Sequence, residues 1–209
     1  MKSYQLQLML FFLFIYQFSY AQKSATQKRI YTTKAIDNLE APTIDGVIDE
    51  KSWNLVKWDS DFIENDPDEN TPPTYQTKFK IIYDAKYLYI AVRSFDEEPE
   101  KIAKRLSRRD GFAGDRVNII IDSYFDKRTA FAFTVTAAGV KGDEIVTKNG
   151  NNWDDSWNPI WYTKARIDDK GWWAEIKIPL SQLRFGTAKE QVWGLNIVRQ
   201  LFRKNERSV

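Results

Sequence analysis

The sequence predicts an all-β protein, a two-sheet antiparallel β-sandwich with short helical excursions. Apolar and polar residues alternate with a period of two in several short segments, which is typical of strands that bury one face. Turn residues separate these segments at spacings of roughly 8–12 residues, as in sandwich proteins. Because each strand has a single apolar face, we expect two sheets that pack through those faces.

The N-terminal part of the predicted module contains little regular structure. Residues 22–35 are polar and without periodicity, so we expect a flexible lead-in. The Asp-Gly pair at positions 45–46 is a tight-turn signal. We expect Asp49, which follows it, to cap a short helix over residues 50–55 in which Trp53 turns inward.

A β-hairpin begins the strand-rich part of the chain. Residues 64–73 are a loop by composition, because Pro, Asn and Asp follow one another closely there. Residues 75–83 and 87–95 then alternate, and the sequence "DAK" between them supplies the turn of a hairpin. We expect residues 98–110 to form a short helical or irregular excursion before the next strand.

The remaining predicted strands show the same alternation. They cover residues 116–122, 131–139, 141–146, 162–168, 171–179 and 192–202. In the segment "GWWAEIKIP", Trp172 lies on the apolar face, whereas Trp173 shares the other face with Glu175. Trp173 is therefore excluded from the core unless a second layer covers it. Trp193 aligns with the apolar face of the last strand, so we expect it inside.

The first 21 residues are typical of a secretory signal peptide. Lys2 precedes an apolar run, and the small residues Ser19 and Ala21 occupy the two positions that a signal peptidase reads. A membrane anchor is the alternative, but the run is shorter than a spanning helix requires. We expect cleavage after Ala21 and export to the periplasm, the outer membrane or the cell surface. Residues 36–209 end directly after a strand, and we expect them to be one module of a longer protein.

The composition excludes several kinds of site. The chain has no cysteine and no histidine, which removes thiolate metal sites, the commonest general base and the commonest metal ligand. Both methionines, Met1 and Met9, lie in the leader, so the mature chain lacks the usual haem ligands. Loss of Lys2 leaves 30 basic against 29 acidic residues, which does not favour nucleic acid as a partner. No nucleotide-binding motif is present, so we expect no nucleotide.

Three tryptophans in "NNWDDSWNPIWY" are candidates for sugar binding. Trp153, Trp157 and Trp161 are spaced four apart, and Asp154 and Asp155 lie between them. An exposed indole can stack on the C–H face of a sugar ring while carboxylates and amides bind its hydroxyls. Each ring alone is more often buried in a core than exposed.

Carboxylates in the loops allow two further interpretations. A pair of carboxylates facing each other across a cleft could act as acid and base in glycoside hydrolysis. Loop acids such as Asp96 and Asp122 could instead hold a structural calcium ion, whose ligands are all oxygen atoms. Solvated acids or turn caps are the alternative to both.

Six segments in order resemble the carbohydrate-binding module family 9-like domain found at the start of large exported Bacteroidetes proteins. They are "IDGVIDEKSW", "YDAKYLYIAVRSFD", "GDRVNIIIDSYFDKRTAFAFTVTAAGVKGDE", "WNPIW", "GWWAEIKIPLSQLRF" and "WGLNIVRQLFRKNE", and they cover about residues 36–206. The resemblance implies a β-sandwich related to sugar-binding modules, often with structural calcium and often attached to glycosidases. It also implies a C-terminal barrel-like region beyond this sequence.

Three functions follow as hypotheses. The leading one is non-catalytic glycan binding that serves polysaccharide breakdown, with Trp153 and Trp173 as the exposed platform. In the resemblance, Trp157 and Trp161 fit a W-x-x-x-W pattern that is structural at the end of the sandwich. The alternatives are an interaction domain that caps the C-terminal region, and a glycoside hydrolase-type activity through paired carboxylates.

Overall fold

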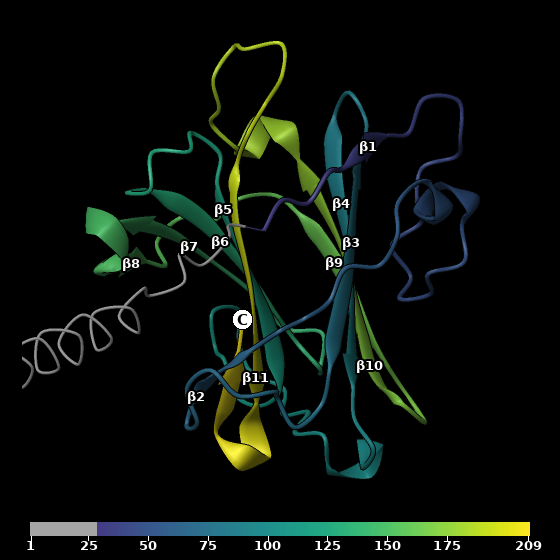
Figure 1. The fold of residues 1–209 in the computed structure, drawn as a ribbon, viewed down its shortest axis with the longest axis vertical. Helices are drawn as coiled ribbons and strands as arrows, with labels where there is room; N and C mark the ends of the chain where they lie inside the picture. The colour runs from purple at the N-terminus through teal and green to yellow at the C-terminus, as the bar shows by residue number, and fades with distance from the viewer. Residues whose placement is uncertain (1–28) are drawn as a thin grey trace, which may run out of the picture. The chain divides into compact units, whose positions relative to one another are not determined.

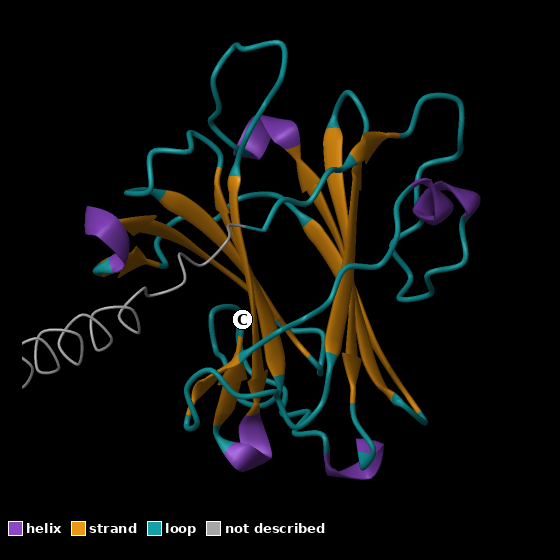
Figure 2. Ribbon diagram, viewed as in Figure 1, coloured by secondary structure: helices purple, strands orange, loops and turns teal. Residues whose placement is uncertain are grey.

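The computed structural model describes residues 29–209, so the predicted signal peptide lies outside the described residues. Residues 33–209 form one compact unit in which two β-sheets face each other (Figure 1). The five-stranded sheet has the order β1-β3-β4-β10-β9, and the seven-stranded sheet has the order β2-β12-β11-β5-β6-β7-β8. Loops and short turns of 3₁₀ helix connect the strands (Figure 2). The predicted two-sheet sandwich is therefore confirmed.

The strand bounds follow the alternating segments of the sequence closely. The five-stranded sheet contains β1 (Lys34–Ala35), β3 (Thr77–Tyr83), β4 (Tyr87–Phe95), β10 (Gly171–Pro179) and β9 (Tyr162–Asp168). The seven-stranded sheet contains β2 (Glu64–Asp66), β12 (Glu206–Ser208), β11 (Gly194–Leu201), β5 (Arg116–Asp122), β6 (Ala130–Thr136), β7 (Lys141–Thr147) and β8 (Asn152–Asp154).

Strand pairing is antiparallel except at one edge. The predicted hairpins β3–β4 and β9–β10 are both present. Strand β1 pairs in parallel with β3 and lies at the end of the segment predicted as a lead-in. Strand β2 pairs with β12 inside the segment that we predicted to be a loop, so this part of the prediction is wrong. Both additions are short edge strands whose pairing depends on distant residues.

The main core fills the space between the sheets. Strands β4 and β10 contribute Ile90, Trp172 and Ile176, and strands β5 and β6 contribute Ile119 and Phe133; all five are at most 1 % exposed. Trp172 therefore lies inside, as the alternation predicts. Trp193 precedes β11, is half-buried and packs against Phe185 at 5.3 Å between ring centroids. The prediction that Trp193 belongs to the main core is wrong, because its ring packs beside Phe185 and stays partly exposed.

A second layer covers the outer face of the five-stranded sheet. Residues 36–58, which include the 3₁₀ turn η1 (Lys51–Leu55), pack Trp53 and Val56 against Tyr89 and Ala91 of β4. Trp53 is 1 % exposed, so its predicted inward position is confirmed. The predicted Asp49 cap is wrong: Glu50 is the N-cap residue, and it makes no side-chain capping bond. Its carboxylate instead accepts a hydrogen bond from the backbone N–H of Thr43, at 2.6 Å.

This layer buries two charged side chains of the sheet. Lys80 on β3 donates from Nζ to the backbone carbonyl of Trp53, at 2.6 Å, and burial lowers the pKa of its ammonium. Glu175 on β10 is fully buried, and its Oε2 accepts the backbone N–H groups of Asp45 and Gly46, each at 3.0 Å. Its Oε1 is buried without a hydrogen-bond partner. The turn predicted at positions 45–46 is therefore held down by a carboxylate of the sheet.

A buried arginine joins the two sheets at one end of the sandwich. Arg199 of β11 is 2 % exposed and donates to the backbone carbonyls of Tyr75, Gln76 and Phe95, at 3.1, 3.2 and 2.6 Å. Burial lowers the pKa of its guanidinium to about 10, against the opposing attraction of Asp115 and other acids. These bonds tie β11 of one sheet to the ends of β3 and β4 of the other.

The helical excursions are all short in the described part of the chain. Besides η1, they are the 3₁₀ turns η2 (Pro99–Lys101), η3 (Lys148–Gly150), η4 (Leu180–Gln182) and η5 (Phe202–Lys204). Within residues 29–209, no helix has the length and apolar character needed to cross a membrane.

Candidate functional site

Two of the predicted tryptophans are structural. Trp161 is 1 % exposed, and its indole N–H donates to Oδ1 of Asp143 at 2.7 Å. Its ring meets Phe133 edge to face at 5.3 Å. Trp157 is half-buried and packs against Phe131 and Phe133, at 5.0 and 5.6 Å. The W-x-x-x-W pair therefore closes the end of the sandwich and offers no open platform.

Trp173 is not an exposed platform, which corrects the prediction. The Arg93 guanidinium stacks on its ring at 4.4 Å, and Trp58 from the second layer lies at 6.0 Å. Its indole N–H donates to Oδ2 of Asp168 at 2.8 Å, and Arg93 binds the same carboxylate with two hydrogen bonds of 2.8 Å. Alternation placed Trp173 outside the main core correctly, but residues 36–58 supply the second layer that half-buries it.

Trp153 is the exposed ring of the set. It lies on β8, is 43 % exposed, and donates from its indole N–H to the backbone carbonyl of Gly150 at 2.9 Å. Opposite residues of a ladder share a face, so the pairing of Trp153 with Val146 places the indole on the outer face of the seven-stranded sheet. Asp154 and Asp155 follow it and are both exposed.

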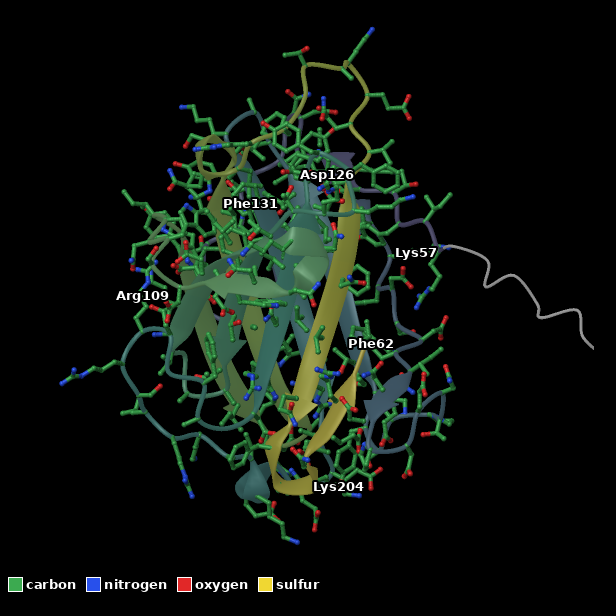
Figure 3. All side chains as sticks on the ribbon, turned by 90° about the vertical axis from the view of Figure 1, so that its left-hand side faces the viewer. Lys57, Phe62, Arg109, Asp126, Phe131 and Lys204 are labelled. Atoms are coloured by element: carbon green, nitrogen blue, oxygen red, sulfur yellow. The ribbon has the colours of Figure 1, made fainter. Side chains whose placement is uncertain are left out.

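Polar side chains gather on this same outer face. The register aligns Glu144 of β7 with Ala132 and Ile120, and Ile120 with Asn196 of β11. One step along the strands, Asn118 of β5 is aligned with Thr134 and Gly142. Figure 3 looks toward this side of the sandwich, with the loop that carries Arg109 at its edge.

We call these outer-face side chains, together with Phe112 and Trp153, the outer-face site; its polar members are Arg116, Asn118, Glu144 and Asn196.

A phenylalanine covers a glycine at one end of the outer-face site. A Cβ built on Gly142 would lie 2.3 Å from Cε1 of Phe112, so the ring rests directly on the strand backbone. Arg116 donates to the backbone carbonyl of Phe112 at 3.1 Å, and its guanidinium lies 5.9 Å from the ring centroid. Gly142 and Val146 are four residues apart on β7, so Phe112 and Trp153 mark two ends of a strip roughly 13 Å long.

Replacement of Gly142 by alanine is expected to displace Phe112, because the added methyl group and the ring cannot occupy the same space. We expect the free energy of unfolding to fall by about 1–3 kcal/mol, as for other overpacking changes. We also expect any ligand of the outer-face site to bind more weakly. Thermal unfolding and a binding titration measure the two effects. The control is Gly186→Ala, where no heavy atom lies within 4 Å of the added Cβ. Equal melting temperatures and equal ligand affinities of the two variants would contradict the packing of Phe112 on Gly142.

The electrostatics of the strip are mixed. Burial, followed by the charges of Asp155 and Asp110, raises the pKa of the Glu144 carboxyl, while Arg116 opposes this. Burial lowers the pKa of the Arg116 guanidinium. The Oδ1 atom of Asn118 is buried without a hydrogen-bond partner. A site with one carboxylate, one guanidinium and the exposed amide of Asn196 matches a ligand that carries several hydroxyl groups.

The sequence prediction missed most of these residues. Asn118 had an available signal, because it interrupts an apolar strand between Val117 and Ile119 and must point to the outer face. Phe112 had none, since its position depends on contact with Gly142, which lies 30 residues away and is distinguished only by the missing Cβ.

Neither predicted calcium ligand offers a free carboxylate. Both oxygen atoms of Asp96 accept hydrogen bonds from Arg203, at 2.7 and 2.8 Å. The two oxygen atoms of Asp122 accept the backbone N–H groups of Asp126 and Lys127. No group of three or more acidic side chains in residues 29–209 is placed to hold a metal ion. Both carboxylates are thus engaged by neighbouring donors, and calcium binding by this chain stays a prediction.

Comparison with known proteins agrees with the fold. The chain is similar to a family 9 carbohydrate-binding module from Caldicellulosiruptor kristjanssonii solved with glucose, at 20 % identity, 85 % coverage of both chains and a TM-score of 0.57. It is also similar to such a module solved with cellotriose, at 19 % identity, 84 % coverage of this chain, 80 % of that chain and a TM-score of 0.58. None of the curated proteins matches it.

The family model described as "Carbohydrate family 9 binding domain-like" matches residues 44–206, which is most of the chain. This chain is therefore a member of the carbohydrate family 9 binding domain-like family.

Proposed function

We propose that the outer-face site binds a saccharide without catalysing a reaction. The observation that carries this proposal is the pair of rings, Phe112 and Trp153, at the two ends of a strip that also presents Asn118, Glu144 and Asn196. Membership of a carbohydrate-binding family and the sugar-bound relatives of similar fold support it.

The strip between the two rings is built on small residues of its middle strand. The middle strand β6 presents only small side chains on this face, and Ala132 and Thr134 are at most 2 % exposed. Larger or polar side chains stand on the neighbouring strands and cover these small residues, so the strip presents Glu144 and Asn196 to the solvent beside the two rings. A sugar ring lying there would meet an aromatic face at one end and hydrogen-bonding groups along its sides, the usual composition of a small-ligand site.

Trp153→Ala is the direct test. We expect binding of glucose or cello-oligosaccharides to weaken by about 1–3 kcal/mol, because a few aromatic anchors carry most of the energy of a small site. Titration calorimetry measures the loss. The melting temperature should change little, since the ring is exposed.

The matched control is Phe202→Ala. Phe202 follows the C-terminal end of β11, lies outside the outer-face site, and is 43 % exposed like Trp153. Binding that survives Trp153→Ala, or falls equally with Phe202→Ala, contradicts the proposal. Release of reducing sugar from the bound oligosaccharide would contradict the non-catalytic part of the proposal. It would favour the alternative of glycoside hydrolysis by carboxylates near Glu144.

We further propose that the protein acts outside the cytoplasm. The leader in residues 1–21 supports export, and a glycan-binding module next to a C-terminal membrane region would hold polysaccharide near the enzymes that degrade it. Cell fractionation, with protease accessibility of the module on intact cells, separates the periplasm from the cell surface.

A further inference from the structure

A second groove lies on the other sheet. A hollow of about 810 Å³ opens between residues 41–44 of the second layer and the outer face of the five-stranded sheet. Its walls include Tyr87, Tyr162 and Lys177, and Lys141 from the neighbouring sheet reaches it as well. None of the residues that line it is acidic. We call it the tyrosine groove, and it shares no residue with the outer-face site.

Lys177 carries an unpaired positive charge in this groove. Its Nζ lies 4.1 Å from the ring centroid of Tyr87, 5.7 Å from Tyr89 and 6.0 Å from Tyr162. Among residues 29–209, no carboxylate lies within 4.0 Å of this ammonium. The charge of Lys177 helps to lower the pKa of the Asp84 carboxyl, which accepts its hydrogen bonds from Tyr89 Oη and from the backbone N–H groups of Lys86 and Tyr87. The described residues accept no hydrogen bond from the Lys177 ammonium, so its N–H groups can donate to a ligand.

Lys141 adds a second positive charge at the edge of the groove. Its Nζ donates to the backbone carbonyl of Trp161 at 3.0 Å and lies 5.4 Å from the centroid of that ring. Burial, followed by the charge of Arg109, lowers the pKa of this ammonium, while Asp143 opposes the change. A bound anion would offset the cost of holding this partly buried cation.

An aromatic surface stands beside the two cations. Tyr162 pairs with Lys177 across β9 and β10, so their side chains share the outer face of the sheet. The side chain of Tyr162 is 51 % exposed, which leaves its ring open to a ligand. An open ring next to an unpaired ammonium suits a ligand with both an apolar ring face and a negative group.

We propose that the tyrosine groove is a second saccharide subsite that takes an acidic sugar. The ring of a sugar packs on Tyr162, and its carboxylate or sulfate accepts hydrogen bonds from the ammonium of Lys177. This inference rests on the proposed carbohydrate-binding function and adds the chemical class of a second ligand, held on a different sheet from the outer-face site.

Titration of the purified chain with three oligosaccharides tests the proposal. Tetragalacturonate carries carboxylates, a sulfated galactan tetrasaccharide carries sulfates, and cellotetraose is neutral. We expect Lys177→Gln to weaken binding of at least one acidic ligand about tenfold, since it removes a charge-assisted hydrogen bond, and to leave cellotetraose unaffected. Tyr162→Ala should weaken the same acidic ligand without lowering the melting temperature, because the ring is exposed.

Lys164→Gln is the matched control. Lys164 is an exposed lysine on the same strand and face as Tyr162 but does not line the groove, so the variant removes the same charge. Equal loss in Lys164→Gln and Lys177→Gln would show general charge attraction and overturn the subsite. Acidic ligands that bind the unaltered chain no better than cellotetraose would also overturn it.

The same titrations distinguish failure of the outer-face site from failure of the tyrosine groove. Trp153→Ala should weaken cellotetraose and leave the acidic ligand bound to the tyrosine groove. Acidic binding that depends on Lys177 while cellotetraose does not bind at all would support the groove and contradict the outer-face site.

Discussion

Replacement of Arg199 by alanine is expected to destabilise the fold by about 3–5 kcal/mol, the range found when one partner of a buried charged network is removed. The variant removes the hydrogen bonds from the guanidinium to the backbone carbonyls of Tyr75, Gln76 and Phe95, which join the two sheets. It also removes a positive charge that opposes the effect of burial on Asp115, whose carboxyl has a pKa raised by burial. Urea unfolding of the variant beside the unaltered chain measures the loss.

Arg207→Ala is the control for the Arg199 variant. Arg207 forms an ion pair with Asp66 at 2.7 Å, but both side chains are about half exposed. Such surface pairs contribute about 0–1 kcal/mol, so the control should unfold nearly like the unaltered chain. Similar losses in the two variants would mean that Arg199 does not join the sheets as described.

Glu175→Gln is expected to stabilise the chain at pH 8 by up to about 3 kcal/mol and to have little effect at pH 4. Burial, and then the charge of Glu50, raises the pKa of the Glu175 carboxyl to about 7 from the ordinary 4.5. The folded state therefore binds this proton more tightly than the unfolded state does. The stabilising contribution is complete below pH 4.5 and is lost as the pH rises through about 7.

The glutamine variant isolates this effect. Its amide oxygen can still accept the N–H groups of Asp45 and Gly46, and its NH₂ group replaces the unpartnered Oε1. The chain has no histidine, so the window between pH 5 and 8 is free of the side chain that usually titrates there. Denaturant unfolding at several pH values measures the contribution of Glu175 to the free energy of unfolding. Glu190→Gln, at an exposed position, is the control. A Glu175→Gln variant that follows the pH dependence of the unaltered chain contradicts the assignment.

The alternation of the sequence predicted the strands of both sheets because each strand buries one face in the main core. It placed Trp172 inside and Trp173 outside that core, and both positions are correct relative to it. Alternation describes only the nearest layer, however. The packing of residues 36–58 over Glu175 and Trp173 depends on contacts between segments more than 100 residues apart, which no local pattern contains.

The candidate site was less predictable than the fold. Composition and clustering drew attention to three tryptophans, of which Trp153 alone stands in the outer-face site. Trp161 fits the W-x-x-x-W pattern and is buried against Phe133, with its indole N–H bonded to Asp143, so it is structural as the resemblance implied. Phe112 reaches the site through a loop whose path is set by Gly142 and Arg116. A site on the outer face of a sheet combines residues from several strands. The register of those strands decides which side chains lie next to one another, and a single segment of sequence does not contain that information.

The edge strands of both sheets also protect the molecule from association with its own copies. A bare edge strand is a template for another chain, and proteins blunt such edges with short strands or charges. Here β2 and β8 are three residues long, and β1 covers β3 with only two. The remaining edge, β9, carries the exposed Lys164 and Arg166. Many copies of this domain at high local concentration can therefore lie side by side without their sheets fusing into aggregates.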